Sequence, residues 1–178
     1  ILPSLTALAV PIMATALVQT AYSLTDMAWV GRLGSAAVTS VGAAGMYTWL
    51  SSGLVTIARM GGQVKAAQSI GEGKREEAGL YAGGAIQLTI FFALMFAAVT
   101  NLFAEPLIRF FALNEDKIVA DAVVYLRIAC GLILFSFLNQ TLTGLYTAAG
   151  DSKTPFLANL IGMGANVVLD TVLIFGWG

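Results

Sequence analysis

Long apolar segments, separated by short polar or glycine-rich connections, make up most of this 178-residue chain. A helix needs roughly 20 mostly apolar residues to cross a bilayer, and five segments reach that length. They lie at about 5–30, 37–58, 78–103, 125–148 and 154–175. Such runs are too uniform for membrane barrel strands, which alternate over ~10 residues. The pattern therefore predicts an all-α polytopic membrane protein with five transmembrane helices.

The connections between these segments carry most of the charged residues. We expect a charged loop at 71–77, a longer loop with an amphipathic helix at 105–121, and a tight turn at 150–155. Gly150 can end the fourth helix, and Pro155 suits the first turn of the fifth. Arg59 and Lys65 follow the second apolar segment and are assigned to its loop. No arginine is therefore expected inside the helix bundle.

The composition agrees with a membrane protein and narrows the chemistry. Only 11% of the residues are charged, whereas soluble domains carry roughly 25%. The net charge of −1, with no interleaved basic and aromatic residues, argues against a nucleic-acid partner. Histidine, the commonest general base and metal ligand, is absent, and the single Cys130 has no partner within the chain. No cofactor is expected, and membrane lipid is the expected surrounding.

Two aspartates, Asp26 and Asp170, interrupt apolar segments, whereas the other charges lie in loops or near helix ends. A charge inside hydrocarbon costs at least ~2.5–3.5 kcal/mol by insertion scales, so it usually has a function or a partner. The first and fifth segments run in the same direction, which puts both carboxylates roughly 8–9 Å below one membrane face. Burial favours the neutral form of a carboxylate, reached by binding H⁺ or Na⁺. The pair of aspartates therefore predicts a cation site. The alternative is a purely structural role, in which neighbouring groups hydrogen-bond each buried carboxylate.

Polar residues form a line at helical spacing on three of the predicted helices. Residues three or four apart share a helix face, and such a line facing lipid would leave polar groups unsatisfied. We therefore expect a polar cavity within the bundle, although such residues often serve only as interhelical hydrogen bonds worth ~0.6 kcal/mol. The three lines are Thr15, Gln19, Tyr22 and Asp26; Ser136, Asn139 or Gln140, Thr143 and Thr147; and Asn159, Gly162, Asn166 and Asp170.

Four stretches along the chain are similar to one known family. They are 24–34 (LTDMAWVGRLG), 70–78 (IGEGKREEA), 148–155 (AAGDSKTP) and 166–176 (NVVLDTVLIFG). In this order they resemble the end of the first helix, two loops and the fifth helix of the multidrug and toxic compound extrusion (MATE) family. The resemblance implies an antiporter of two six-helix lobes. Residues 1–178 would then be five helices of the N-terminal lobe, with the C-terminal lobe absent.

The resemblance also implies a function for particular residues. A MATE antiporter would export small cationic, amphipathic compounds in exchange for H⁺ or Na⁺, and the resemblance implies a setting in a prokaryotic inner (plasma) membrane. The N-lobe cation site of many members uses an aspartate of helix one and an asparagine–aspartate pair of helix five. Asp26, Asn166 and Asp170 hold those positions here, with a possible Na⁺ bound between them. Tyr22 matches a tyrosine near that site, and Gln19, Asn139 and Thr143 are expected neighbours.

Two other functions remain open from the residues. A lipid-linked saccharide flippase of the same superfamily should carry cavity arginines for pyrophosphate, and none is expected here. An intramembrane aspartyl protease also uses paired aspartates, but it should show a Gly-x-Gly-Asp motif. Asp26 follows Leu24-Thr25 and Asp170 follows Val168-Leu169 instead. We therefore expect a transporter and not an enzyme.

Overall fold

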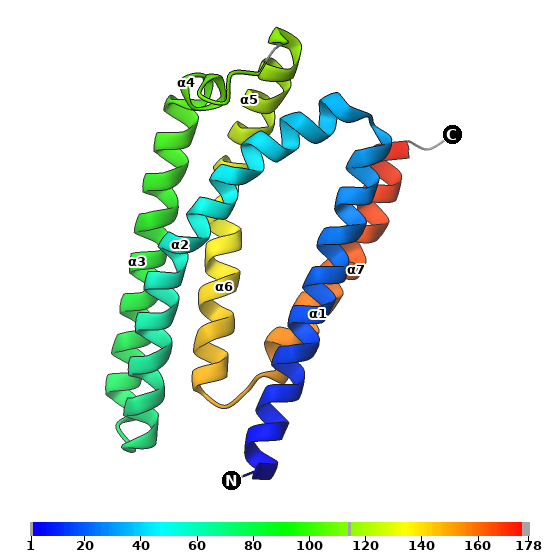
Figure 1. Cartoon of the computed structure of the whole chain (residues 1–178). Helices are drawn as coiled ribbons and strands as arrows, with labels where there is room; N and C mark the ends of the chain where they lie inside the picture. The colour runs from blue at the N-terminus through cyan, green and yellow to red at the C-terminus, as the bar shows by residue number, and fades with distance from the viewer. Residues whose placement is uncertain (1, 114, 176–178) are drawn as a thin grey trace.

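The computed structural model describes the backbone of residues 2–113 and 115–175, and their side chains except those of residues 2–8, 11, 12, 15 and 170–175. These ranges form helices and no strands (Figure 1). The helices are α1 (Leu2–Arg32), α2 (Ser35–Gly71), α3 (Arg75–Leu102), α4 (Ala104–Arg109), α5 (Asp116–Gly131), α6 (Ile133–Ala148) and α7 (Lys153–Phe175). The all-α prediction is confirmed.

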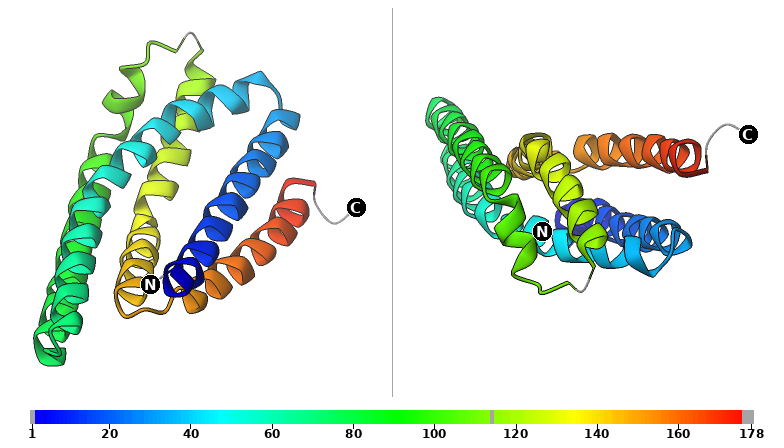
Figure 2. Two further views of the ribbon diagram at one scale, coloured as in Figure 1. Left: turned by 60° about the horizontal axis from the view of Figure 1, so that its bottom comes forward. Right: turned by 90° about the horizontal axis from the view of Figure 1, so that it is seen from above.

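The helices pack in two groups. In the first, α2 packs along α3, α5 and α6, and α3 also packs on α5 and α6. In the second, α1 packs along α7, and both run in the same direction as expected (Figure 1). Seen from above, α3 and the later part of α2 lie on one side, α1 and α7 on the other, and α6 lies between them, while α2 begins beside the end of α1 (Figure 2). This arrangement brings the three predicted polar lines, on α1, α6 and α7, to one region.

The first group holds the buried core. Leu126 of α5, Phe137 of α6 and Val55 of α2 belong to one cluster of fully buried apolar side chains. Within the same group the hydroxyl groups of Thr89 in α3 and Thr141 in α6 lie 2.8 Å apart. A hydrogen bond between two buried hydroxyls satisfies both without water. The α2–α3–α5–α6 group therefore forms a packed wall beside the α1–α7 pair.

Two expected helix boundaries were wrong. α2 continues for thirteen residues beyond the expected end at 58, so Arg59 and Lys65 lie within a helix and not in a loop. The continuation is stabilised by small residues at helical spacing, because Ala58, Gly62 and Ala66 are buried on one face. The apolar run at 125–148 is not one helix but the end of α5 followed by α6. The break follows Gly131, and glycine is among the weakest helix formers.

The lengths of the helices bear on the membrane. By length and apolar composition, α3 alone among the described residues could cross a bilayer as one helix. α5 and α6 together pass the same test as a pair bent by 44°. The number of five spans therefore stays a prediction.

The turn before α7 is built as the sequence predicts. Gly150 has a φ of 84°, a left-handed conformation that glycine adopts at no steric cost. The backbone N–H groups of Lys153 and Thr154 then donate to the Asp151 carboxylate at 3.0 Å each. The side chain of Asp151 thereby satisfies the first free donors of α7. This turn sets where α7 begins beside α1.

Candidate functional site

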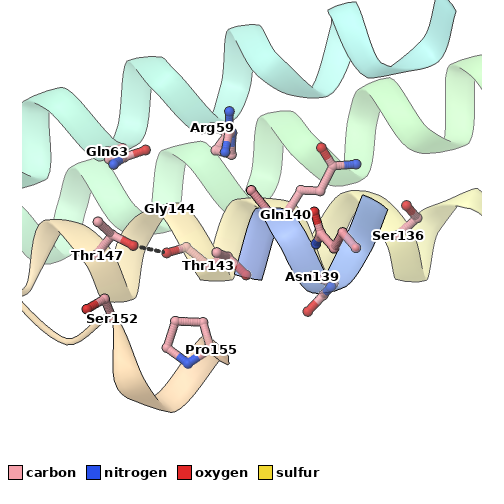
Figure 3. A pocket seen from close by; sticks show the side chains of 12 residues that line it. Arg59, Gln63, Ser136, Asn139, Gln140, Thr143, Gly144, Thr147, Ser152 and Pro155 are labelled. Atoms are coloured by element: carbon pink, nitrogen blue, oxygen red, sulfur yellow. Dashed lines mark hydrogen bonds between the residues drawn. The ribbon is translucent and has the colours of Figure 1, made fainter. Parts of the chain in front are cut away.

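A polar cavity lies where α1, α6 and α7 meet. It consists of two hollows of about 470 and 830 Å³ that share Gln19, Ser136 and Asn139 in their walls. The smaller hollow reaches α2 and is lined there by Arg59 and Gln63 (Figure 3). The larger hollow extends along α7 toward Asn166. Helices from both groups therefore build one continuous recess.

The structure places most of the residues singled out from the sequence on the wall of this cavity. Gln19 and Tyr22 come from α1, Asn139 and Thr143 from α6, and Asn166 from α7. They meet because residues three or four positions apart share a helix face, and these faces turn toward one another. The three polar lines thus converge on a single recess, although this placement alone assigns no role to any residue.

Asn166 presents an unusual atom. Its side-chain oxygen Oδ1 is buried and has no hydrogen-bond partner among the described residues. A buried acceptor without a partner costs about 1–3 kcal/mol, so it usually marks a missing ligand or water. Amide oxygens are ligands for hard cations. The position of Asn166 on the cavity wall fits a cation ligand.

The two aspartates lie on neighbouring helices. Asp26 is partly buried on α1. Asp170 lies on α7, one turn beyond Asn166, and its side chain falls outside the described side chains. Because α1 packs along α7, the backbone arrangement is compatible with a shared site. The predicted contact between the two carboxylates stays a prediction.

A hydrogen bond between α6 and α7 gives part of the polar line a structural role. Asn139 donates through Nδ2 to the side-chain oxygen of Asn159 at 3.0 Å. Asn159 in turn donates to the backbone oxygen of Pro155 at 2.8 Å. The first of these bonds joins α6 to the start of α7, and the second lies within α7. Asn139 therefore contributes to packing as well as to the cavity wall.

Arg59 is the cavity residue that the sequence prediction missed. It was assigned to a loop, but it lies in α2 and lines the smaller hollow. The expectation of no arginine inside the bundle was therefore wrong. A hydropathy criterion ends a segment at the first charged residue, and it stops at Arg59 for that reason. The signal that could have found it is the run of small residues after it, at 62, 66 and 69, which continues the helical face.

Comparisons with known proteins agree with this fold. The MatE family model matches residues 11–172. A probable multidrug resistance protein NorM from Thermotoga maritima is 30% identical over 170 residues, which are 95% of this chain and 36% of that protein. A FAD transporter from Shewanella oneidensis is 25% identical over 160 residues, which are 88% of this chain and 34% of that protein.

A solved structure gives the same result for the fold. It is a MOP superfamily transporter from Pyrococcus furiosus, described as having a binding pocket of reverse polarity that suggests a different function. Its TM-score is 0.90 at 25% identity, covering 97% of this chain and 38% of that chain. This chain spans about a third of the length of the curated relatives it matches. Since the family model covers nearly the whole chain, the chain belongs to the MatE family, whose members are integral membrane transporters and not enzymes.

Proposed function

We propose that this chain forms five helices of the six-helix N-terminal lobe of a secondary antiporter. The whole protein, with a second lobe, would export small amphipathic compounds from a prokaryotic cell in exchange for H⁺ or Na⁺. Relatives named as multidrug resistance proteins support the export of drugs. The bacterial and archaeal sources of the relatives support a setting in the plasma membrane.

The proposed coupling site consists of Asp26, Asn166 and Asp170. The observation that carries it is the buried Asn166 oxygen, which has no hydrogen-bond partner among the described residues. A carboxylate on each side of this oxygen would supply the charge that a Na⁺ ion needs. Protonation of one carboxylate would neutralise the same site, because two close carboxylates do not both stay ionised at low cost. One site could thus accept either ion.

Coupling requires that the cation favours one conformation of the lobe over another. A ligand shifts a conformational equilibrium only by its difference in affinity for the two states. α1 packs mainly along α7 and much less against α2 of the packed wall. We propose that cation binding between α1 and α7 changes how this pair sits beside α6. The shape of the polar cavity would change with it, and substrate would be released.

The cavity wall bears on the class of substrate. The family resemblance implies cationic compounds, yet the described residues of the cavity wall include Arg59 and no carboxylate. A positive wall does not favour a positive ligand. The same arginine removes the argument against the lipid-linked saccharide flippase, which keeps that function as the second candidate. Flipping of a lipid-linked saccharide in vesicles by the whole protein, without efflux of dyes, would favour it.

Transport by the whole protein in vesicles tests the proposal. Efflux of the cationic rhodamine 123 and of the anionic fluorescein is measured under a Na⁺ gradient, a pH gradient, or both in opposition. We expect one gradient to drive efflux in the wild type, and Asn166→Ala to lower this efflux about tenfold or more by removing a ligand of the coupling ion. Asn101→Ala is the matched control, because Asn101 is a partly buried asparagine on α3 outside the cavity. Equal efflux by the two variants would contradict the assignment.

A further inference from the structure

We propose that the smaller hollow, between α2 and α6, binds an oxyanion carried by an amphipathic substrate, and that Arg59 is the residue that binds it. The oxyanion is a carboxylate or a phosphate. The inference deepens the proposed function, because it assumes that the cavity receives the exported compound. It assigns that compound a negative group, where the family resemblance implies a cation.

The first support is the position of Arg59 along α2. Twelve residues separate it from the end of α2 at Gly71, which corresponds to about 18 Å at 1.5 Å per residue. Arg59 therefore lies well away from the connection between α2 and α3, and it lines the smaller hollow. An arginine inside the bundle of a membrane protein is rare, faces a cavity or the bundle interior, and marks a path for substrate or ion.

The second support is the lack of a partner. The Nε atom of Arg59 is buried and makes no hydrogen bond among the described residues. The ion pairs within those residues involve other side chains, at Lys74 and Arg109. A guanidinium group keeps its charge and presents five donors in a planar fork that matches carboxylate and phosphate geometry. An anion that enters the hollow would accept hydrogen bonds from this guanidinium group.

The third support is the chemistry of the surrounding wall. Gln63 and Gln140 bring amide groups, and Thr143 and Thr147 bring hydroxyl groups, to the same hollow (Figure 3). The described lining residues include no aspartate or glutamate that would repel an anion. Neutral donors around one cation are the usual composition of an anion site, because they add hydrogen bonds without adding competing charge.

The fourth support is the room that Gly144 leaves for the side chain of Arg59. A Cβ atom at Gly144 would lie 2.8 Å from Cγ of Arg59 and 3.1 Å from Oε1 of Gln63. The aliphatic part of Arg59 therefore lies directly against the backbone of α6. This contact fixes the side chain of Arg59 beside α6 at the wall of the hollow. Gly144 acts as a positioning residue, and an added methyl group should displace the guanidinium.

Binding of two dyes to the purified whole protein tests the inference. Fluorescein and rhodamine 123 share a flat three-ring system, but the first is anionic and the second is cationic. Affinities are measured by fluorescence anisotropy in nanodiscs of neutral phosphatidylcholine. We expect the wild type to prefer fluorescein, and Arg59→Gln to weaken fluorescein binding about tenfold or more while rhodamine binding is unchanged or tighter. Arg59→Lys should keep most of the preference.

Two further variants separate charge loss from placement. Lys65→Gln removes one positive charge from the same helix, at an exposed position outside the cavity wall, and should leave both affinities unchanged. Gly144→Ala keeps the charge but should weaken fluorescein binding through displacement of Arg59. Equal affinity of the wild type for the two dyes, or an unchanged preference in Arg59→Gln, would overturn the proposal.

The same variants distinguish this inference from the proposed function. Binding in nanodiscs needs no ion gradient, so failure of gradient-driven efflux leaves the dye result intact. A second arm replaces part of the lipid with anionic phosphatidylglycerol. If this lipid displaces fluorescein from the wild type, the oxyanion that Arg59 binds belongs to a lipid headgroup. Anion binding by Arg59 is then retained, but the assignment of the anion to an exported compound is overturned. If the lipid does not displace fluorescein, the oxyanion belongs to a compound that enters the cavity.

Discussion

Gly62 in α2 and Gly144 in α6 each lie where a neighbouring residue leaves no room for a methyl group. A Cβ atom at Gly62 would overlap the Cβ atom of Ala85 in α3, and one at Gly144 would press on Arg59. Most other glycines, including the adjacent Gly61, have nothing within 4 Å of that position. In membranes, helices associate through such close approaches of small residues. The sequence contains 19 glycines, and only the packing tells which of them are needed.

Substitution of neighbouring glycines tests this close approach. We expect Gly62→Ala to lower the stability of the whole protein by about 1–3 kcal/mol, because the added methyl group forces α2 and α3 apart. Gly61→Ala is the matched control on the same helix and should cause no loss. The thermal unfolding midpoint in a single detergent measures both. A loss of equal size in the two variants would show that α2 and α3 do not pack as described.

The sequence predicted that neutral polar residues line a cavity, but it did not predict that Arg59 lines it too. Gln19, Tyr22, Asn139, Thr143 and Asn166 line the recess because helical spacing puts polar residues on one face. Arg59 could not be found in this way, since its place depends on how far α2 continues and on what packs beside it. The lack of a hydrogen-bond partner for the Asn166 oxygen, within the part of the chain that the structure describes, was also beyond prediction, because such partners come from the tertiary structure.

At the scale of helices, apolar runs predicted which segments are helical but not where each begins or ends. α5 starts at Asp116, nine residues before the apolar run was expected to begin, because Val119, Ala122 and Leu126 form a buried stripe between exposed charges. α2 extends beyond its expected end for the same reason, because a stripe of buried small residues continues along one of its faces. Hydropathy averages over a helix and misses amphipathic ends, whereas helical periodicity records them. The turn before α7 was predicted well, since Gly150 and Pro155 have strong local preferences.

Asp151 offers a test of how this turn holds α7. Hydrogen bonds from Thr154 hold the pKa of the Asp151 carboxyl below its usual value. A carboxyl with a lowered pKa stabilises the folded state above its unfolded pKa of about 3.9, and this contribution is lost as the pH falls through the folded value. We therefore expect hydrogen-exchange protection of the Thr154 amide to fall below about pH 4.

Two variants complete this test. Asp151→Asn keeps an oxygen acceptor but has no proton to gain, so its protection should not change over the same pH range. Asp151→Ala removes the acceptor and should show weak protection at every pH. If Asp151→Asn showed the same pH dependence as the wild type, another group would control the start of α7.

At the scale of the whole molecule, two helix groups meet around one polar cavity. α1 and α7 run side by side in the same direction, as the number of segments between them predicts. Two lines of observation point to ligands at different ends of the cavity, namely the Asn166 oxygen along α7 and the Arg59 side chain on α2. A site for a cation and a site for a substrate can thus share one recess, which would let each ligand affect the other.

The central claim is that Asp26 and Asp170 act together as the coupling site. The most direct measurement is gradient-driven export by the whole protein in vesicles, with Asp26→Asn and Asp170→Asn compared with the wild type. Asp121→Asn, at an exposed position of α5, is the control for loss of one acidic group. We predict that each of the first two variants abolishes export, while Asp121→Asn retains it. Full export by both Asp26→Asn and Asp170→Asn would contradict the account.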